Sequence, residues 1–178
     1  MKPELLRARL LLIEDHGPTA TMLQTMLAAL GFTKVTHAIN TAQAIETLTS
    51  GAFDLILCDY QLGIVNGLML VRMIRRQDGL GNPNMPIMMI TAHADPERVA
   101  DAVAAGVDDF LVKPVQPEVM ARCLANLLER PRSFTKSKDY AGPDRRRKQL
   151  IGHPGRRQED NTDQSASPRN KWIVPPKT

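Results

Sequence analysis

Three short apolar runs in this sequence each end on charged side chains. Residues 10–13 run into Glu14 and Asp15, residues 55–58 end on Asp59, and residues 110–112 run into Lys113. Runs of this length suit strands that are buried on both faces of a parallel sheet. In open parallel sheets, ligands gather at the carboxyl ends of the strands. If these strands are parallel neighbours, three carboxylates and one ammonium group share one edge of the sheet.

Such an edge could carry phosphoryl chemistry. The three carboxylates repel one another unless a cation lies between them. Mg²⁺ suits this position, because it binds carboxylate oxygens and keeps waters that a phosphate can displace. A carboxylate beside Mg²⁺ and an ammonium group can attack phosphorus and form an aspartyl phosphate. Thr91, at the end of another apolar run, could donate a hydrogen bond to a phosphoryl oxygen. The plain alternatives are that each acid caps a turn or faces water, and that Thr91 reflects strand propensity.

The elements that must position these residues alternate regularly. Apolar runs predict strands at residues 9–14, 33–38, 54–58, 86–91 and 108–112. Helical spacing follows each of them, with helices expected to open at residues 17, 41, 67, 95 and 116. Gly31 and Gly51 are helix stops, Thr41 is a candidate cap, and Asp95-Pro96 is a typical helix start. The pattern predicts a doubly wound α/β fold with a five-stranded parallel sheet and five helices.

Composition limits the class of protein. The chain has 178 residues, of which 43% are hydrophobic and only 4% aromatic, so aliphatic side chains must fill the core. No apolar run could span a membrane, and the start lacks a signal-peptide pattern, so we expect a cytoplasmic protein without membrane contact. Residues 1–130 hold 11 Lys and Arg against 14 Asp and Glu, whereas residues 131–178 hold 12 against 5. We therefore expect one folded domain at residues 8–130 and a basic, disordered tail at 131–178.

These residues resemble a known family. Glu14-Asp15, Asp59, Thr91 and Lys113-Pro114, in this order and on these expected elements, look like the receiver domain of bacterial two-component response regulators (CheY-like). Residues 59–67 resemble the loop that follows the phosphorylated aspartate. The resemblance covers about residues 8–129 and implies a stand-alone phosphoacceptor in a phosphorelay. It implies no enzyme, beyond catalysis of the protein's own phosphorylation and dephosphorylation.

The resemblance implies a phosphoacceptor and a metal site. Asp59 would accept a phosphoryl group from a histidine kinase or a histidine phosphotransfer protein. Asp15, Asp59 and the backbone carbonyl of Gln61 would bind Mg²⁺, with Glu14 helping through water.

The resemblance also implies a switch. Lys113 would contact the phosphoryl group, Thr91 would swing toward it, and Phe110 would be the switch aromatic that turns inward as Thr91 moves. The alternative for Phe110 is an ordinary strand residue. Lys113-Pro114 matches a pair that a cis peptide bond joins in the family. Phosphorylation would reshape the face of residues 94–129 for an unidentified output protein, and a homodimer stays open.

One position departs from the family pattern, and two others match positions that affect the lifetime of the phosphate. Gly63 stands where the family usually has proline, which should loosen the loop. Gln61 and His93 occupy positions that tune how fast the phosphate is lost. A lone loop histidine such as His93 is otherwise most often exposed and inert.

Two rival functions stay open at this point. A transcription regulator could bind nucleic acid, but only through the tail with its basic run at residues 145–148, and such runs are more often simply solvated. Residues 140–146 are similar to segments that follow some receivers, and residues 172–176 could dock on a partner. An aspartate-nucleophile phosphatase would want a second acid two residues after the nucleophile, where this chain has Gln61.

Overall fold

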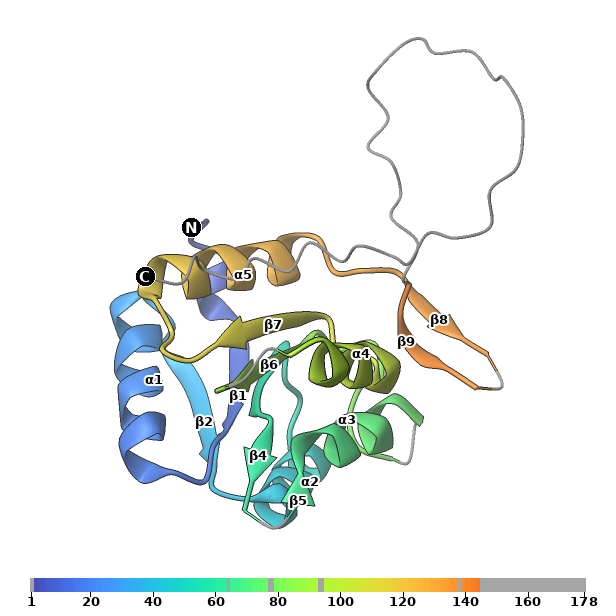
Figure 1. Ribbon diagram of the computed structural model, residues 1–178. Helices are drawn as coiled ribbons and strands as arrows, with labels where there is room; N and C mark the ends of the chain where they lie inside the picture. The colour runs from blue at the N-terminus through green and yellow to red at the C-terminus, as the bar shows by residue number, and fades with distance from the viewer. Residues whose placement is uncertain (1, 64, 77–78, 93–94, 138, 145–178) are drawn as a thin grey trace, which may run out of the picture. The chain divides into compact units, whose positions relative to one another are not determined.

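A computed structural model describes residues 2–63, 65–76, 79–92, 95–137 and 139–144. Its centre is a parallel sheet of five strands in the order β2-β1-β3-β6-β7 (Figure 1). The strands are β1 (Arg9–Ile13), β2 (Lys34–Ala38), β3 (Leu55–Asp59), β6 (Ile87–Thr91) and β7 (Asp109–Val112). The order in which successive strands are added reverses between β1 and β3, with β2 on one side and β6 and β7 on the other, and ligands bind at such a point in open α/β folds.

Helices cover both faces of this sheet. The two helices α1 (Gly17–Ala29) and α5 (Pro117–Glu129) pack on one face with alternate strand residues such as Leu10 and Leu12. The opposite face, with Leu11 and Ile13, is covered by α2 (Thr41–Ser50), α3 (Gly67–Arg76) and α4 (Pro96–Ala105). The predicted doubly wound fold, with five strands and five helices, is confirmed (Figure 1).

Side-chain caps fix where two of these helices begin. The carboxylate of Asp95 accepts a hydrogen bond of 2.9 Å from the backbone N–H of Arg98, as the sequence predicts. The helix α2 is capped by Asn40, whose side chain accepts from the backbone N–H of Gln43 at 2.8 Å. Asn40 is therefore the cap and Thr41 is the first helical residue, because the side-chain oxygen of Asn40 accepts a hydrogen bond from an N–H that the first turn leaves free.

The expected loop at residues 59–66 contains a small antiparallel pair, β4 (Gln61–Leu62) and β5 (Val65–Asn66). A short 3-10 helix, η1 (Leu5–Arg7), precedes β1. Neither element was expected from hydrophobic patterning, because each is too short to show a period.

The structure differs from the expected tail at its beginning. Two further strands, β8 (Phe134–Lys136) and β9 (Ala141–Pro143), form an antiparallel hairpin, and the compact unit extends to Asp144 instead of ending at residue 130. Residues 145–178, with the basic run and the segment 172–176, lie outside the described residues. Within the described part of the chain, no helix is long and apolar enough to cross a membrane.

Candidate phosphoacceptor site

Three acids meet at the carboxyl edge of the sheet. Asp59 is the last residue of β3, and Glu14 and Asp15 directly follow β1, which pairs with β3. One carboxylate oxygen from each of the three lies within 4.8 Å of the others. Glu14 is 1% exposed and Asp59 7% exposed, whereas Asp15 is exposed to solvent. The predicted convergence of these acids is therefore present.

Lys113, which directly follows the strand β7, reaches the same acids. Its Nζ donates a hydrogen bond of 2.8 Å to Oε2 of Glu14 and one of 3.1 Å to Oδ2 of Asp59. The backbone N–H of Lys113 donates to the carbonyl oxygen of Thr91 at 2.7 Å, which fixes where the lysine leaves the sheet. A cis peptide bond joins Lys113 to Pro114, as the family resemblance implies.

The site perturbs the acidity of two of its members. Burial raises the pKa of Glu14, and the negative charge of Asp59 raises it further, against the hydrogen bond from Lys113. Burial acts to lower the pKa of Lys113, but its hydrogen bonds to Glu14 and Asp59 outweigh this effect and raise that pKa. Lys113 is therefore held as a cation beside the carboxylates, where it offsets their mutual repulsion.

The loop after Asp59 folds back toward the acids. Gly63 has a φ of 59°, and a Cβ on this residue would lie 3.7 Å from Oδ2 of Asp15. Proline, whose ring holds φ near −65°, could not adopt this backbone. The departure at Gly63 thus gives the loop a left-handed turn beside Asp15. Gln61 lies in β4 with its side chain exposed, opposite Asn66 in the register.

The expected switch residues lie on neighbouring strands. Thr91 is buried at the end of β6 and stands opposite Val112 of β7. Phe110 stands opposite Met89 and packs, partly buried, against the core under α2, α3 and α4. His93, the second residue expected to tune phosphate lifetime, lies outside the described residues.

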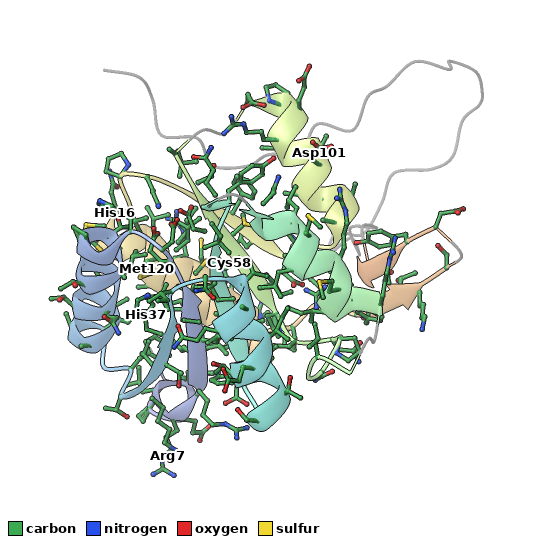
Figure 2. The ribbon with its side chains drawn as sticks, turned by 90° about the horizontal axis from the view of Figure 1, so that it is seen from below. Arg7, His16, His37, Cys58, Asp101 and Met120 are labelled. Carbon is green, nitrogen blue, oxygen red and sulfur yellow. The ribbon has the colours of Figure 1, made fainter. Side chains whose placement is uncertain are left out.

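Two histidines near the acids have structural partners. Nδ1 of His16 lies 2.8 Å from the hydroxyl of Thr19, so this ring is engaged with its own helix. The second histidine, His37 on β2, contacts the backbone of the acidic segment instead of a helix (Figure 2 labels both histidines). Its Nε2 donates a hydrogen bond of 2.8 Å to the backbone carbonyl of Glu14. Sequence reasoning missed His37, because no spacing in the sequence connects it to the acids.

A second missed contact involves the residue after the phosphoacceptor candidate. Tyr60 is largely buried, and Cζ of Arg98 on α4 lies 5.4 Å from the centre of its ring. A guanidinium group at this distance is attracted by the ring face. The same Arg98 pairs with Asp95 at 3.1 Å. The first turn of α4 is thereby tied to the residue next to Asp59.

The acids fit a hard divalent cation. Carboxylate oxygens are the ligands that Mg²⁺ prefers, and an ion held by few protein oxygens keeps waters for a substrate to replace. Within the described residues, Glu14, Asp15 and Asp59 are the group of acids arranged closely enough to hold a metal ion.

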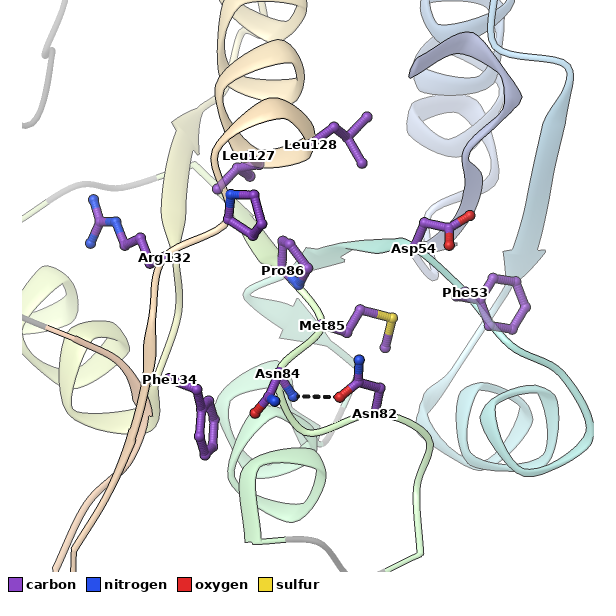
Figure 3. Close-up of a pocket in the computed structure, with 11 residues that line it drawn as sticks. Phe53, Asp54, Asn82, Asn84, Met85, Pro86, Leu127, Leu128, Arg132 and Phe134 are labelled. Carbon is purple, nitrogen blue, oxygen red and sulfur yellow. Dashed lines mark hydrogen bonds between the residues drawn. The ribbon is translucent and has the colours of Figure 1, made fainter. Parts of the chain in front are cut away.

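A pocket of about 420 Å³ lies elsewhere, among residues from the amino ends of β3 and β6, the end of α5 and the strand β8. Figure 3 shows Phe53, Met85, Leu127 and Phe134 around it. None of the four charged site residues lines this pocket. The chemistry therefore lies at the opposite edge of the sheet from this pocket.

Comparisons with known proteins agree with this architecture. The family model for the response regulator receiver domain matches residues 10–125. The chemotaxis protein CheY of Pseudomonas aeruginosa is 29% identical over 122 residues, which are 68% of this chain and 97% of that protein. The hybrid signal transduction histidine kinase G of Dictyostelium discoideum is 35% identical over 109 residues, 61% of this chain but 3% of the kinase.

Among solved structures, a similar one is the receiver domain of the sensor histidine kinase PA1611 from Pseudomonas aeruginosa, which holds a magnesium ion in its active-site cleft. The TM-score is 0.62 at 29% identity, covering 69% of this chain and 98% of that domain. The chain therefore belongs to the response regulator receiver domain family of two-component signalling.

Proposed function

We propose that this receiver accepts a phosphoryl group on Asp59 from a histidine kinase or a histidine phosphotransfer protein. The observation that carries the proposal is the hydrogen bond of 3.1 Å from Lys113 to Asp59, made beside Glu14 and Asp15. A nucleophilic carboxylate needs a cationic group at the oxygens where charge gathers during transfer, and Lys113 supplies one.

The residues fit a Mg²⁺ requirement. Asp15 and Asp59, with the backbone carbonyl of Gln61, would hold the ion, and Glu14 would act through water. Bound there, Mg²⁺ neutralises phosphoryl oxygens. The four residues belong to two segments that the pairing of β1 with β3 holds side by side, which supports this assignment.

In the transfer, a carboxylate oxygen of Asp59 forms a bond to phosphorus as the bond from phosphorus to the donor's imidazole nitrogen breaks. The imidazole keeps the electron pair of the broken bond, and the product is an aspartyl phosphate. Lys113 stays protonated and donates to a phosphoryl oxygen, and the hydroxyl of Thr91 donates to another. Gln61 and His93 would affect how fast water removes the group.

The proposed output is a change of surface. Thr91 of β6 and Phe110 of β7 lie on neighbouring strands, two register positions apart, so a movement of Thr91 toward the phosphoryl group would open room for Phe110 to turn inward. Phenylalanine has no hydroxyl, so this readout acts through packing. The face of residues 94–129 would then bind its output protein differently in the two states.

The test is an intact-mass measurement on the full chain incubated with acetyl phosphate and Mg²⁺. We expect a gain of one phosphoryl group that a chelator abolishes. Asp59→Asn should gain none, whereas Asp101→Asn, a matched change at an exposed acid on α4, should behave as the native chain. Labelling of Asp59→Asn equal to the native chain would refute the assignment.

The label measured by intact mass, together with a turnover assay on a small phosphate ester, separates the proposal from an aspartate-nucleophile phosphatase. Gln61 is not an acid, so it could not protonate a leaving group as such a phosphatase requires. We therefore expect a stable label on Asp59 and no sustained hydrolysis of a small phosphate ester.

A further inference from the structure

The hairpin of β8 and β9 contacts α3 and, through Gly142, approaches Gly106 at the end of α4 very closely. A Cβ placed on Gly142 of β9 would lie only 2.8 Å from Cα of Gly106, and a Cβ placed on Gly106 would lie 2.8 Å from the carbonyl oxygen of Ala141. Real Cβ atoms essentially never approach other atoms this closely. The two backbones, 36 residues apart in sequence, are therefore in contact at a distance that only glycine at both positions allows.

The hairpin is closed by its own hydrogen bonds. The hydroxyl of Tyr140 donates to the carbonyl oxygen of Pro143 at 2.9 Å, and the N–H of Asp144 donates to the carbonyl oxygen of Ser133 at 2.6 Å. The N–H of Ser137 donates to the carbonyl oxygen of Tyr140 at 2.7 Å. The sequence Tyr-Ala-Gly-Pro-Asp at 140–144 thus closes a hairpin and places Gly142 against Gly106.

The other side of this contact is rigidly built. Gly106 ends α4 with a φ of 97°, and its carbonyl accepts a hydrogen bond of 2.9 Å from Nε of Arg75 on α3. Arg75 is 2% exposed and also donates to the carbonyl of Met85 at 2.7 Å and to Asp108 at 2.6 Å. Through Arg75, Gly106 is therefore linked to α3, to the segment before β6 and to the residue before β7.

The same helix reaches the phosphoacceptor site at its other end. Arg98, in the first turn of α4, lies over Tyr60, the residue that follows Asp59. A helix of ten residues is about 15 Å long, so α4 links the surroundings of Tyr60 directly to Gly106. A displacement of the first turn of α4 would therefore act both on the hydrogen bond from Arg75 to Gly106 and on the close contact of Gly106 with Gly142.

From this geometry we propose that the hairpin of residues 133–144 is an autoinhibitory arm, docked on Gly106 in the unphosphorylated protein and loosened when Asp59 is phosphorylated. The inference rests on the proposed phosphorylation of Asp59. Because coupling is reciprocal, a docked hairpin also holds α4 in the arrangement that opposes phosphorylation.

The first test follows amide hydrogen exchange of residues 134–143 in the full chain, with and without acetyl phosphate and Mg²⁺. We expect exchange to become about ten-fold faster in the phosphorylated native protein and to stay unchanged in Asp59→Asn. If intact mass shows the phosphoryl group while hairpin exchange is unchanged, the arm is refuted and the proposed function stands. If no phosphoryl group is gained, the proposed function fails and this inference fails with it.

The second test works in the opposite direction. Gly142→Val places side-chain atoms where Cα of Gly106 and the phenol of Tyr140 lie, so it disturbs both the contact with Gly106 and the closure of the hairpin. We expect rapid exchange in the hairpin, an intact parallel sheet and phosphorylation by acetyl phosphate about five-fold faster. The matched control is Thr135→Val, at the exposed residue opposite Gly142 in the hairpin register, which should leave both readouts unchanged. A Gly142→Val protein whose hairpin stays protected, or is released without any change in rate, contradicts the proposal.

Discussion

Nζ of Lys113 lies 2.8 Å from Oε2 of Glu14, although 99 residues separate the two in sequence. Glu14 is 1% exposed, so this ammonium group is a principal partner of a carboxylate that water scarcely reaches. The pair comes from the ends of two strands that are not neighbours in the sheet, since β3 and β6 lie between β1 and β7. It therefore depends on the whole sheet being assembled.

Replacing Lys113 by methionine should destabilise the fold. The substitution leaves the buried carboxylate of Glu14 without this cation, which costs about 1–3 kcal/mol in free energy of unfolding. Urea unfolding measures the loss. The double variant Glu14→Gln with Lys113→Met removes the unpaired charge and should recover part of it. Equal stability of the Lys113→Met variant and the native protein would contradict a role in folding for the ion pair of Lys113 with Glu14.

His37 should act on the metal site through the backbone. Its hydrogen bond to the carbonyl of Glu14 holds the turn from which Glu14 and Asp15 project. Removing such a support typically weakens metal binding, so His37→Ala should raise the half-saturating Mg²⁺ concentration for phosphorylation by about ten-fold. His37→Gln can still donate and should recover part of the loss. Thr36→Ala, at the exposed neighbour on β2, is the control and should leave the value unchanged.

The ion pair of Arg75 with Asp108 should matter more for stability than any exposed pair. Burial lowers the pKa of Arg75 and raises that of Asp108, so both charges depend on their mutual contact and on the surrounding backbone groups. Asp108 also accepts a hydrogen bond of 2.8 Å from the N–H of Ile87. Asp108→Asn leaves a buried guanidinium without its counter-charge and should cost about 3 kcal/mol, measured by urea unfolding.

The matched control for that variant is Asp101→Asn, because Asp101 is exposed on α4. An exposed substitution of this kind should change stability by less than about 0.5 kcal/mol. Similar losses in the two variants would mean that the buried pair has no special role.

The thiols should be unreactive in the folded protein. Burial, together with the charge and hydrogen bond of Asp109, raises the pKa of Cys123 to about 12, and burial raises the pKa of Cys58 as well. At pH 8 we expect iodoacetamide to modify neither residue in the native protein and both in urea, as read by intact mass. Rapid native modification of Cys123 would contradict this.

The same shift has a consequence for stability. The folded pKa of Cys123 lies above the unfolded value near 9, so its contribution is full below pH 9 and is lost as the pH rises toward 12. Cys123→Ala should therefore flatten the fall in unfolding free energy above pH 9.

The sequence predicted those parts of the molecule that depend on hydrophobic patterning. Apolar runs ending on Glu14, Asp59 and Lys113 were enough to predict their convergence, because parallel strands share one carboxyl edge. The alternation of helices and strands likewise predicted the sheet and both covering layers. These features follow from the burial of the central strands β1, β3 and β6 on both faces.

The parts that the sequence did not predict depend on single contacts between distant residues. The contact of Gly106 with Gly142 has no periodicity, and the polar composition after residue 131 indicated irregular chain. The burial of Arg75 has no signal in the sequence, because only the folded loop before β6 brings carbonyl groups to its guanidinium. The pairing of Tyr60 with Arg98 also arises only once α4 packs against the sheet.

The scarcity of large aromatic side chains in the core has a practical consequence for spectroscopy. The single tryptophan of the chain is Trp172, far in sequence from the acids. Tyr60, by contrast, is largely buried and follows Asp59 directly, with Arg98 over its ring. In a Trp172→Phe background, Tyr60→Trp would place the only indole next to Asp59, and quenching of its fluorescence by Mg²⁺ would report occupancy in real time.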